Sequence, residues 1–510
     1  MDAFLSGMAI LTDPTMLLVI LSGTLVGIIV GALPGLSGAT TAALVLPITV
    51  TMTPIMGIAF LGSLYCAANF GGSITAILLN APGDPSASAT AFDGYQMSKR
   101  GLAGKALGIS AIASTIGGIT SVIVLIIAAP ALARFAYEIG PPEYFALALI
   151  GLSMLALVGG EGATKNLISG AIGVLIATVG LDLTTGVERF TFGIPDLTDG
   201  VGIVPVLTGI FAISEMFIIA GQLHEPIEHF KLKKIELPTR ADMRKSAKSI
   251  AIGSGLGTVI GILPALGATA AALLTYGEVK RWSHYKEEFG KGAIEGVAGP
   301  EAANNSAVGG AMVPTLALGI PGSTTAAIIL AGMLVQGIRP GPHLFNEQPT
   351  LLYAVFASML AANVLYLILG FGFAKLFARV TLIPAHYLWP VVFASSVIGA
   401  YAPNQSMVEL WIMIGAGIIG YMMRRYGFSA APLVMGLVLG TLVEETLKQS
   451  LILFDQNWLM FFTRPIVDVL FGLLIAAAVL PRIVRWRRAR TANALARNSN
   501  SNLKEGRSNA

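Results

Sequence analysis

The sequence predicts an all-α polytopic membrane protein made of two inverted repeats, with broken helices or re-entrant hairpins, and one extra C-terminal transmembrane helix. The first observation is composition: the 510 residues are 55% hydrophobic and 12% charged, with a mean hydropathy of +0.76, whereas soluble domains carry about 25% charged residues. The second is length, because several apolar segments reach the roughly 20 residues that a spanning helix needs. The third is repetition, since matching motifs recur in the same order in both halves.

The apolar segments are expected to be helices, and some are too short, or too rich in Gly and Pro, to cross a bilayer unbroken. In the first half they lie at 16–33, 38–53, 55–80, 105–130, 142–158, 163–181 and 200–221. In the second half they lie at 248–264, 266–276, 293–318, 323–337, 349–378, 384–400, 407–423 and 429–447, followed by one at 463–481. Discontinuous helices of this kind hold the solute in many secondary transporters.

Four pairs of motifs indicate an internal duplication. The run GIIVGALPGLSGAT from Gly27 matches GTVIGILPALGAT from Gly257, with one residue deleted. The run AAN followed by GG and PG occurs around Asn69 and again around Asn304. Two further pairs follow in the same order, Pro141 with Pro384 and Pro205 with Pro432. The predicted organisation is a first repeat (1–222), a cytoplasmic linker (223–247), a second repeat (248–447), a C-terminal transmembrane helix with a basic end (448–490) and a disordered cytoplasmic tail (491–510).

Lys and Arg residues gather in four connecting segments, which the positive-inside rule places in the cytoplasm. These segments are 94–105, 222–248, the pair Arg424 and Arg425, and 482–490. The acidic loop 182–199 then falls outside, the helix 105–130 runs outward, and its partner 349–378 runs inward. The two repeats are therefore expected to be inverted, with the N-terminus outside and the C-terminus in the cytoplasm.

Four broken segments, two in each half, are expected to meet between the repeats. The first pair contains Pro34 and Pro264, and the second contains Pro82 and Pro321. In the second pair Asp84 and Ser323 occupy aligned positions, and both residue types are good N-caps. Each break should therefore expose N–H groups at the positive end of a helix dipole, which is a natural site for a carboxylate. The alternative is that Gly and Pro only permit close helix crossing.

Two sets of residues are predicted to line this site. The substrate-binding set is Asn69, Pro82, Gly83, Ser86, Asn304, Asn305, Pro321, Gly322, Ser323 and Thr324, and the cation-binding set is Ser37, Thr40, Thr41, Thr269 and Asp84. Asn side chains bind carboxylates and cations, but they also serve as links between helices. Asp84 either balances a bound cation or only caps its helix. Glu301 is an intramembrane carboxylate, functional by default, unless it lies at the membrane interface near Lys291.

Signatures of enzymes are sparse. The five histidines form no HExxH motif, there is no complete phosphate loop, and the single cysteine, Cys66, has no partner for a disulfide or thiolate site. The chain is therefore predicted to be no enzyme, to hold no cofactor and no metal beyond a possible sodium ion, and to draw energy from a sodium or proton gradient. An ion channel and an intramembrane enzyme remain the alternatives from other classes.

The runs GALPGLSGAT, YCAANFGGSITAILLNAPG and GPEAANNSAVGGAMVPTLALGIPGS resemble the large, TctA-type membrane subunit of tripartite tricarboxylate transporters, and the similarity covers about residues 16–450. The resemblance implies a bacterial inner-membrane symporter for a citrate-like tricarboxylate or another organic anion. It also implies two partners, a small four-helix membrane subunit and a periplasmic solute-binding protein. No nucleic-acid partner is expected, and a homo-oligomer stays open.

The two halves of the site need not be equivalent. Ala265 and Gly267 stand where the first half has Gly35, Ser37 and Gly38. Inverted repeats permit both rocking and elevator motions. The paired breaks favour the elevator, because they are similar to opposed hairpin tips.

The predicted topology can be tested with reporter fusions at Lys233 and Arg490. Both fusions are expected to report a cytoplasmic location, because both positions lie in segments rich in Lys and Arg. A phosphatase reporter active only in the periplasm, paired with a fluorescent one active in the cytoplasm, makes the measurement at each site. A periplasmic signal at either site contradicts the inverted arrangement.

Overall fold

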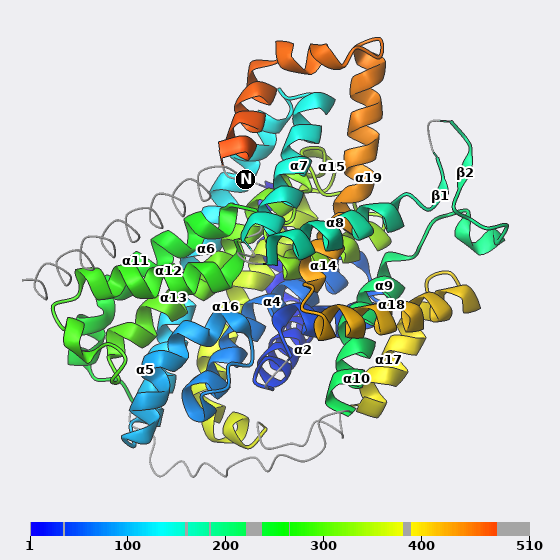
Figure 1. Ribbon diagram of the computed structural model, residues 1–510. Helices are drawn as coiled ribbons and strands as arrows, with labels where there is room; N and C mark the ends of the chain where they lie inside the picture. The colour runs from blue at the N-terminus through cyan, green and yellow to red at the C-terminus, as the bar shows by residue number, and fades with distance from the viewer. Residues whose placement is uncertain are drawn as a thin grey trace, which may run out of the picture.

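The computed structural model describes residues 2–33, 36–158, 162–182, 185–220, 237–264, 266–380 and 389–476. In this part of the chain nearly all regular structure is helical (Figure 1), which confirms the predicted all-α class. Some expectations concern residues outside these ranges: the prolines and glycines at Pro34, Gly35 and Ala265, the basic residues Lys231, Lys233, Lys234 and 482–490, and the tail 491–510.

The predicted breaks interrupt helices in both halves. In the first half α2 (Pro14–Gly31) is followed by α3 (Gly38–Val50), and α4 (Pro54–Leu79) by the 3₁₀ turn η2 (Pro85–Ala87) and α5 (Ser88–Lys99). In the second half α11 (Arg240–Ile262) is followed by α12 (Gly267–Trp282), and α13 (Ile294–Leu318) by α14 (Thr324–Val335).

Two residues in the left-handed conformation end the long broken helices. Asn80 ends α4 with φ 57°, and Gly319 ends α13 with φ 71°. Gly and Asn are the residues that adopt this conformation most readily at a helix C-terminus. The same local device thus produces the break at corresponding places in the two halves.

The remaining helices follow in the same general order in each half. In the first half they are α1 (Asp2–Met8), α6 (Ala103–Ala136), α7 (Pro141–Val158), α8 (Ala163–Ala177), α9 (Ile203–Thr208), the π-helical turn η5 (Gly209–Ile213) and α10 (Ser214–Ala220). In the second half they are α15 (Leu344–Glu347), α16 (Pro349–Val380), α17 (Trp389–Tyr401), α18 (Met407–Arg425) and α19 (Ala430–Leu453). The inverted orientation of the halves and their boundaries stay predictions.

Six helices among the described residues are long and apolar enough to cross a membrane by length and composition. They are α2, α4, α6, the segment Pro349–Gly372 of α16, α18 and α19. Shorter apolar helices include α3, α8 and α14. The helix α5 lies outside the predicted spans because its sequence, SATAFDGYQMSK, is largely polar.

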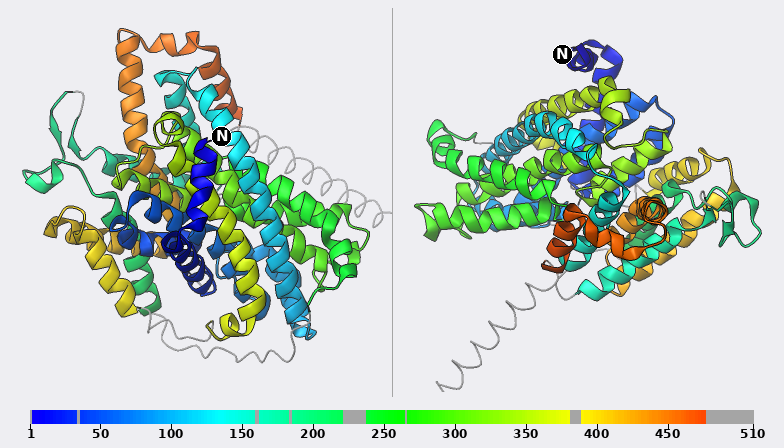
Figure 2. Two further views of the ribbon diagram at one scale, coloured as in Figure 1. Left: turned by 180° about the vertical axis from the view of Figure 1, so that it is seen from behind. Right: turned by 90° about the horizontal axis from the view of Figure 1, so that it is seen from above.

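The helices form two bundles. The first bundle comprises α1–α6 and α11–α16, in which α11 and α6 pack against α13, and α2 packs against α4. The second bundle comprises α7–α10 and α17–α19, in which α19 packs against α7 and α8, and α18 against η5. Seen from above, α11–α13 lie at one side and the helices of the second bundle at the other (Figure 2). The bundles meet where α3 and α14 contact α9, and where α14 contacts α19.

A short hairpin projects from the second bundle (Figure 1). Its strands β1 (Gly180–Leu181) and β2 (Glu188–Arg189) are antiparallel. Arg189 holds the hairpin on α19 through two hydrogen bonds to Glu444, of 2.5 and 3.2 Å. These bonds raise the pKa of the Arg189 guanidinium. Lys448 extends the contact by pairing with Asp182 at 2.7 Å.

Small residues allow the helices of the first bundle to touch backbone to backbone. A methyl group added to Gly27 of α2 would lie 2.8 Å from Cβ of Ala67 on α4. One added to Gly261 of α11 would lie 2.8 Å from Cα of Ala307 on α13. Such small-residue contacts are how membrane helices approach closely without a hydrophobic driving force.

The close contact between α11 and α13 makes a testable pair of variants. In Gly257→Ala the new methyl would lie 2.6 Å from Cα of Ala303, so we expect destabilisation by about 1–3 kcal/mol from overpacking. The matched control is Gly255→Ala on the same helix, where nothing lies within 4 Å. The control should be neutral or stabilise by up to about 1 kcal/mol. Thermal unfolding in detergent measures both, and equal melting temperatures would contradict the packing.

Candidate functional site

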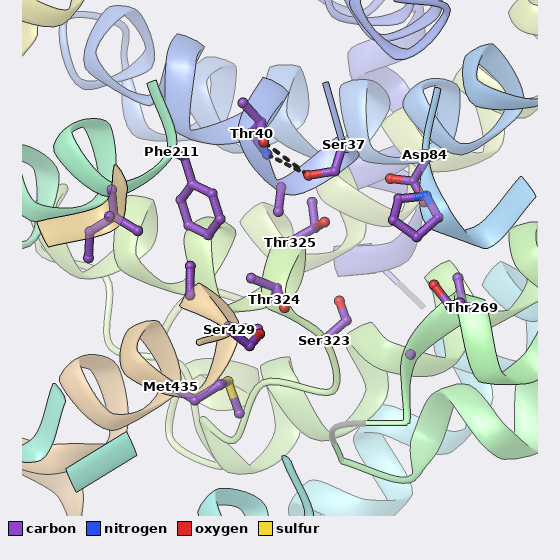
Figure 3. A pocket seen from close by; sticks show the side chains of 18 of the residues that line it. Ser37, Thr40, Asp84, Phe211, Thr269, Ser323, Thr324, Thr325, Ser429 and Met435 are labelled. Carbon is purple, nitrogen blue, oxygen red and sulfur yellow. Dashed lines mark hydrogen bonds between the residues drawn. The ribbon is translucent and has the colours of Figure 1, made fainter. Parts of the chain in front are cut away.

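A cavity of about 430 Å³ lies between the two bundles. The starts of α3, α12 and α14 and the turn before η2 reach it from the first bundle. Seven of the sequence-predicted residues line it: Ser37, Thr40, Asn69, Asp84, Thr269, Ser323 and Thr324. Figure 3 shows Ser37, Thr40 and Asp84 on one side of this space, with Thr269 and Ser323 nearby. The breaks of the two halves therefore meet around one cavity.

Asp84 joins two of the helix starts. Its Oδ2 accepts a hydrogen bond of 2.7 Å from the backbone N–H of Gly38, the first residue of α3. Its Oδ1 accepts one of 2.8 Å from the N–H of Ser86 in η2. Asp84 is thus an N-cap, as expected, and also a bridge between two helices. The N–H group of Gly38, which the sequence suggested would be free, is already bound.

Ser37 and Ser323 cap the two other polar helix starts. Ser37 accepts a hydrogen bond of 3.1 Å from Thr40 N–H, and its Oγ lies 3.0 Å from Thr40 Oγ1. Ser323 accepts one of 3.1 Å from Ala326 N–H, and its Oγ lies 2.7 Å from the hydroxyl of Tyr65 on α4. Tyr65 lines the cavity too, so it adds a phenolic hydroxyl that the motif search did not single out.

The opposite wall comes from the second bundle, which the sequence analysis did not include in the site. It contains Ile210, Phe211, Ser214, Glu215, Gly420, Met423, Arg424, Phe428, Ser429, Ala430, Ala431 and Met435. The guanidinium of Arg424, on the last turn of α18, forms an ion pair with Glu215 on α10. The Arg424 side chain is 50% exposed, whereas that of Glu215 is 7% exposed. A cation is therefore fixed at its base and open toward the cavity.

Two sequence signals point to this wall. Glu215 is a lone carboxylate inside the apolar segment 200–221, and intramembrane carboxylates are functional candidates. Arg424 and Arg425 served only as markers of topology. The cavity is lined by Arg424 but not by Arg425, and only the folded chain distinguishes these neighbours.

The remaining predicted residues lie behind the cavity surface. They are Thr41, Pro82, Gly83, Ser86, Asn304, Asn305, Pro321 and Gly322, none of which lines it. Gly83 N–H donates to Gly72 O at 3.2 Å, and Gly322 N–H donates to Thr315 Oγ1 at 3.2 Å. These glycines hold the chain after each break against α4 and α13.

Asn304 and Asn305 are 0% and 1% exposed. Asn304 Nδ2 donates to a carboxylate oxygen of Glu301 at 3.4 Å, and Asn305 Nδ2 donates to Asn304 Oδ1 at 2.5 Å. Asn69 lies between them and the cavity, because its Nδ2 donates to the backbone oxygen of Asn304 at 3.5 Å. Both residues thus lie one layer behind the predicted site.

The described residues contain no group of three or more His, Cys, Asp or Glu side chains arranged to hold a metal ion. The charged groups at the cavity are Asp84, Glu215 and Arg424. Hydroxyl groups of Ser37, Thr40, Thr269 and Ser323 supply the oxygen ligands that a small cation would meet there.

Comparison with known proteins gives three findings. Residues 17–435 match the sequence profile described as "Tripartite tricarboxylate transporter TctA family". The chain is 39% identical over 459 residues to "Uncharacterized 52.8 kDa protein in TAR-I ttuC' 3'region" of Agrobacterium vitis, across 90% of this chain and 91% of that protein. It is 38% identical over 224 residues to "Uncharacterized protein in TAR-II ttuC' 3'region" of the same organism, across 44% of this chain and 93% of that protein. No solved structure matches.

Proposed function

The chain belongs to the tripartite tricarboxylate transporter TctA family, and from this premise we propose that it imports a citrate-like tricarboxylate or a related carboxylate. It acts as the large membrane subunit of a secondary transporter that depends on a solute-binding protein. The observation that carries the proposal is the cavity between the bundles, where a helix start faces an arginine. Its volume, about 430 Å³, suits a small organic anion.

Two groups of opposite walls fit the carboxylates of such a substrate. On one wall α14 begins at Ser323, and the first N–H groups of a helix have no partner within it. Together with the helix dipole they attract an anion. On the other wall Arg424 offers several N–H donors in a planar fork. It can bind a substrate carboxylate while it keeps Glu215, because its side chain is half exposed.

The start of α3 contributes differently from the start of α14. Because Asp84 already binds Gly38 N–H, a negative charge occupies that helix terminus. A cation is better suited to this side of the cavity than a second carboxylate. Asp84 keeps unused lone pairs, and the hydroxyls of Ser37 and Thr40 lie at the same helix start. This side is where we place a sodium ion, if sodium is the coupling ion rather than the proton.

Further features of the proposal come from the family. A small four-helix membrane subunit and a periplasmic solute-binding protein complete the transporter, which lies in the bacterial inner membrane with its N-terminus periplasmic and its C-terminus cytoplasmic. An elevator-type movement is supported by the position of the cavity, since one wall belongs to each bundle. The proposed moving part is the first bundle, which contains all four broken segments.

Arg424→Gln tests the substrate contact. Loss of hydrogen bonds to a charged group costs about 1.5–3 kcal/mol, so the half-saturating citrate concentration should rise roughly ten- to a hundredfold. Initial rates of labelled citrate uptake at matched membrane levels make the measurement. The matched control is Arg425→Gln, its neighbour on α18, which does not line the cavity and should leave uptake unchanged. Equal effects in the two variants would remove Arg424 from the site.

Reconstitution tests the whole proposal. Proteoliposomes with this chain, the small membrane subunit and the binding protein should accumulate labelled citrate or a related carboxylate when a sodium or proton gradient is imposed. Vesicles with this chain alone should be much slower, because no described extracytoplasmic segment is large enough to capture a dilute solute. Accumulation with both gradients collapsed, or equal rates without the binding protein, would contradict the proposal. A channel would show no counterflow of labelled solute.

A further inference from the structure

A buried carboxylate lies next to the cavity, and the proposed function does not use it. Glu301 on α13 is 0% exposed. Its Oε1 accepts hydrogen bonds from the hydroxyls of Ser73 at 2.6 Å and Thr90 at 2.5 Å. Its Oε2 accepts from Ser110 and Ser114, both at 2.9 Å. Hydroxyls from α4, α5 and α6 therefore enclose the carboxylate, and we call these four side chains with Glu301 the hydroxyl cage.

No Lys, Arg or His among the described residues forms an ion pair with Glu301. The titratable groups on the surrounding helices have other partners. Asp93 of α5 binds the N–H groups at the start of α13 and the hydroxyl of Tyr276, Lys105 of α6 pairs with Asp242 of α11, and Tyr65 of α4 contacts Ser323. Tyr366 of α16, which donates to Asn363, interacts electrostatically with Glu301, and the free thiol of Cys66 lies buried on α4.

The donors in the cage distinguish Glu301 from the capping carboxylates. Asp84 binds backbone N–H groups, which only donate. A hydroxyl both donates and accepts. If Glu301 takes up a proton, its new O–H can donate to a cage hydroxyl, whose own hydrogen then turns to a backbone oxygen four residues earlier. Thr115 on α6 makes such a bond, to Ala111 O at 2.8 Å. The cage can therefore satisfy both the ionised and the protonated carboxyl.

A short polar path joins the cage to the cavity. Asn69 lines the cavity, and Ser73 lies one turn further along the same helix, where it donates to Glu301. Asn304 bonds both Glu301 and, through its backbone oxygen, Asn69. A charge change at Glu301 is thus felt at the substrate site across only two layers of side chains.

We propose that Glu301 in its hydroxyl cage is the proton-carrying site of this transporter, and this inference rests on the proposed function. A proton from water on the entry side converts the carboxylate into a carboxylic acid, and the same proton leaves to water on the exit side. Like charges in a poorly screened interior repel, so a bound substrate anion and a proton on Glu301 favour each other. The coupling is reciprocal, since each ligand strengthens the binding of the other equally.

Glu301→Gln removes the exchangeable proton and keeps the size of the side chain. In proteoliposomes with all three components, the variant should still exchange labelled citrate at equal pH on both sides. It should lose accumulation driven by an inward proton gradient. The matched control is Glu295→Gln, also buried on α13 and bonded to two hydroxyls, of Ser249 and Ser283. Glu295 has no contact with the cavity lining, so this control should accumulate citrate like the wild type.

Two results would overturn the inference: gradient-driven accumulation by Glu301→Gln at the rate of the wild type, or a wild type driven by sodium alone at equal pH. A readout without substrate separates this inference from the proposed function. Infrared difference spectra of the purified protein should show a protonated-carboxyl band that titrates with pH and is missing in Glu301→Gln. Wild type that transports no carboxylate would defeat the proposed function, and the infrared titration would still decide the proton site.

A second variant covers the case in which Glu301→Gln does not fold. Ser110→Ala removes one donor to the ionised carboxylate and leaves Glu301 in place. The midpoint of the infrared titration should move to higher pH, because hydrogen bonds to the charged form favour that form. An unmoved midpoint would show that the band does not belong to the hydroxyl cage.

Discussion

The structure depends on how it satisfies backbone N–H groups that helix breaks release inside an apolar interior. Unpaired backbone groups in hydrocarbon cost several kcal/mol each, by order of magnitude, so breaks survive only where side chains or buried protein take up the bonds. Asp84 does this for two helix starts at once, and Ser323 and Thr315 do it for the second half. The breaks are therefore stable enough to leave a polar cavity between the bundles.

The sequence was informative wherever a local rule decides the structure. Pro and Gly motifs placed all four breaks, and the N-cap roles of Asp84 and Ser323 follow from residue type alone. Long-range contacts were beyond such rules. Nothing near Asp84 in the sequence indicates that it also binds Gly38, and nothing near Asn304 shows that it lies behind Asn69. The wall that contains Arg424 and Glu215 comes from helices without broken motifs, so motif matching passed over it.

The charged groups divide the interior into parts with different chemistry. Asp84 receives donor-only backbone groups and behaves as a fixed negative charge. Arg424 is a fixed positive charge whose guanidinium is half open. Glu301, by contrast, meets hydroxyls that suit either state of the carboxyl. Fixed charges can select a substrate, whereas a charge that changes can link its movement to an ion.

The single cysteine of the chain has a practical consequence. Cys66 is 2% exposed on α4, within the core of the first bundle. A thiol reacts through its accessible thiolate, so reagents in water have no direct route to it in this conformation. Single cysteines introduced at the surface can then be modified selectively in the otherwise natural chain. Distances between such labels on the two bundles would report on their relative movement without a cysteine-free background.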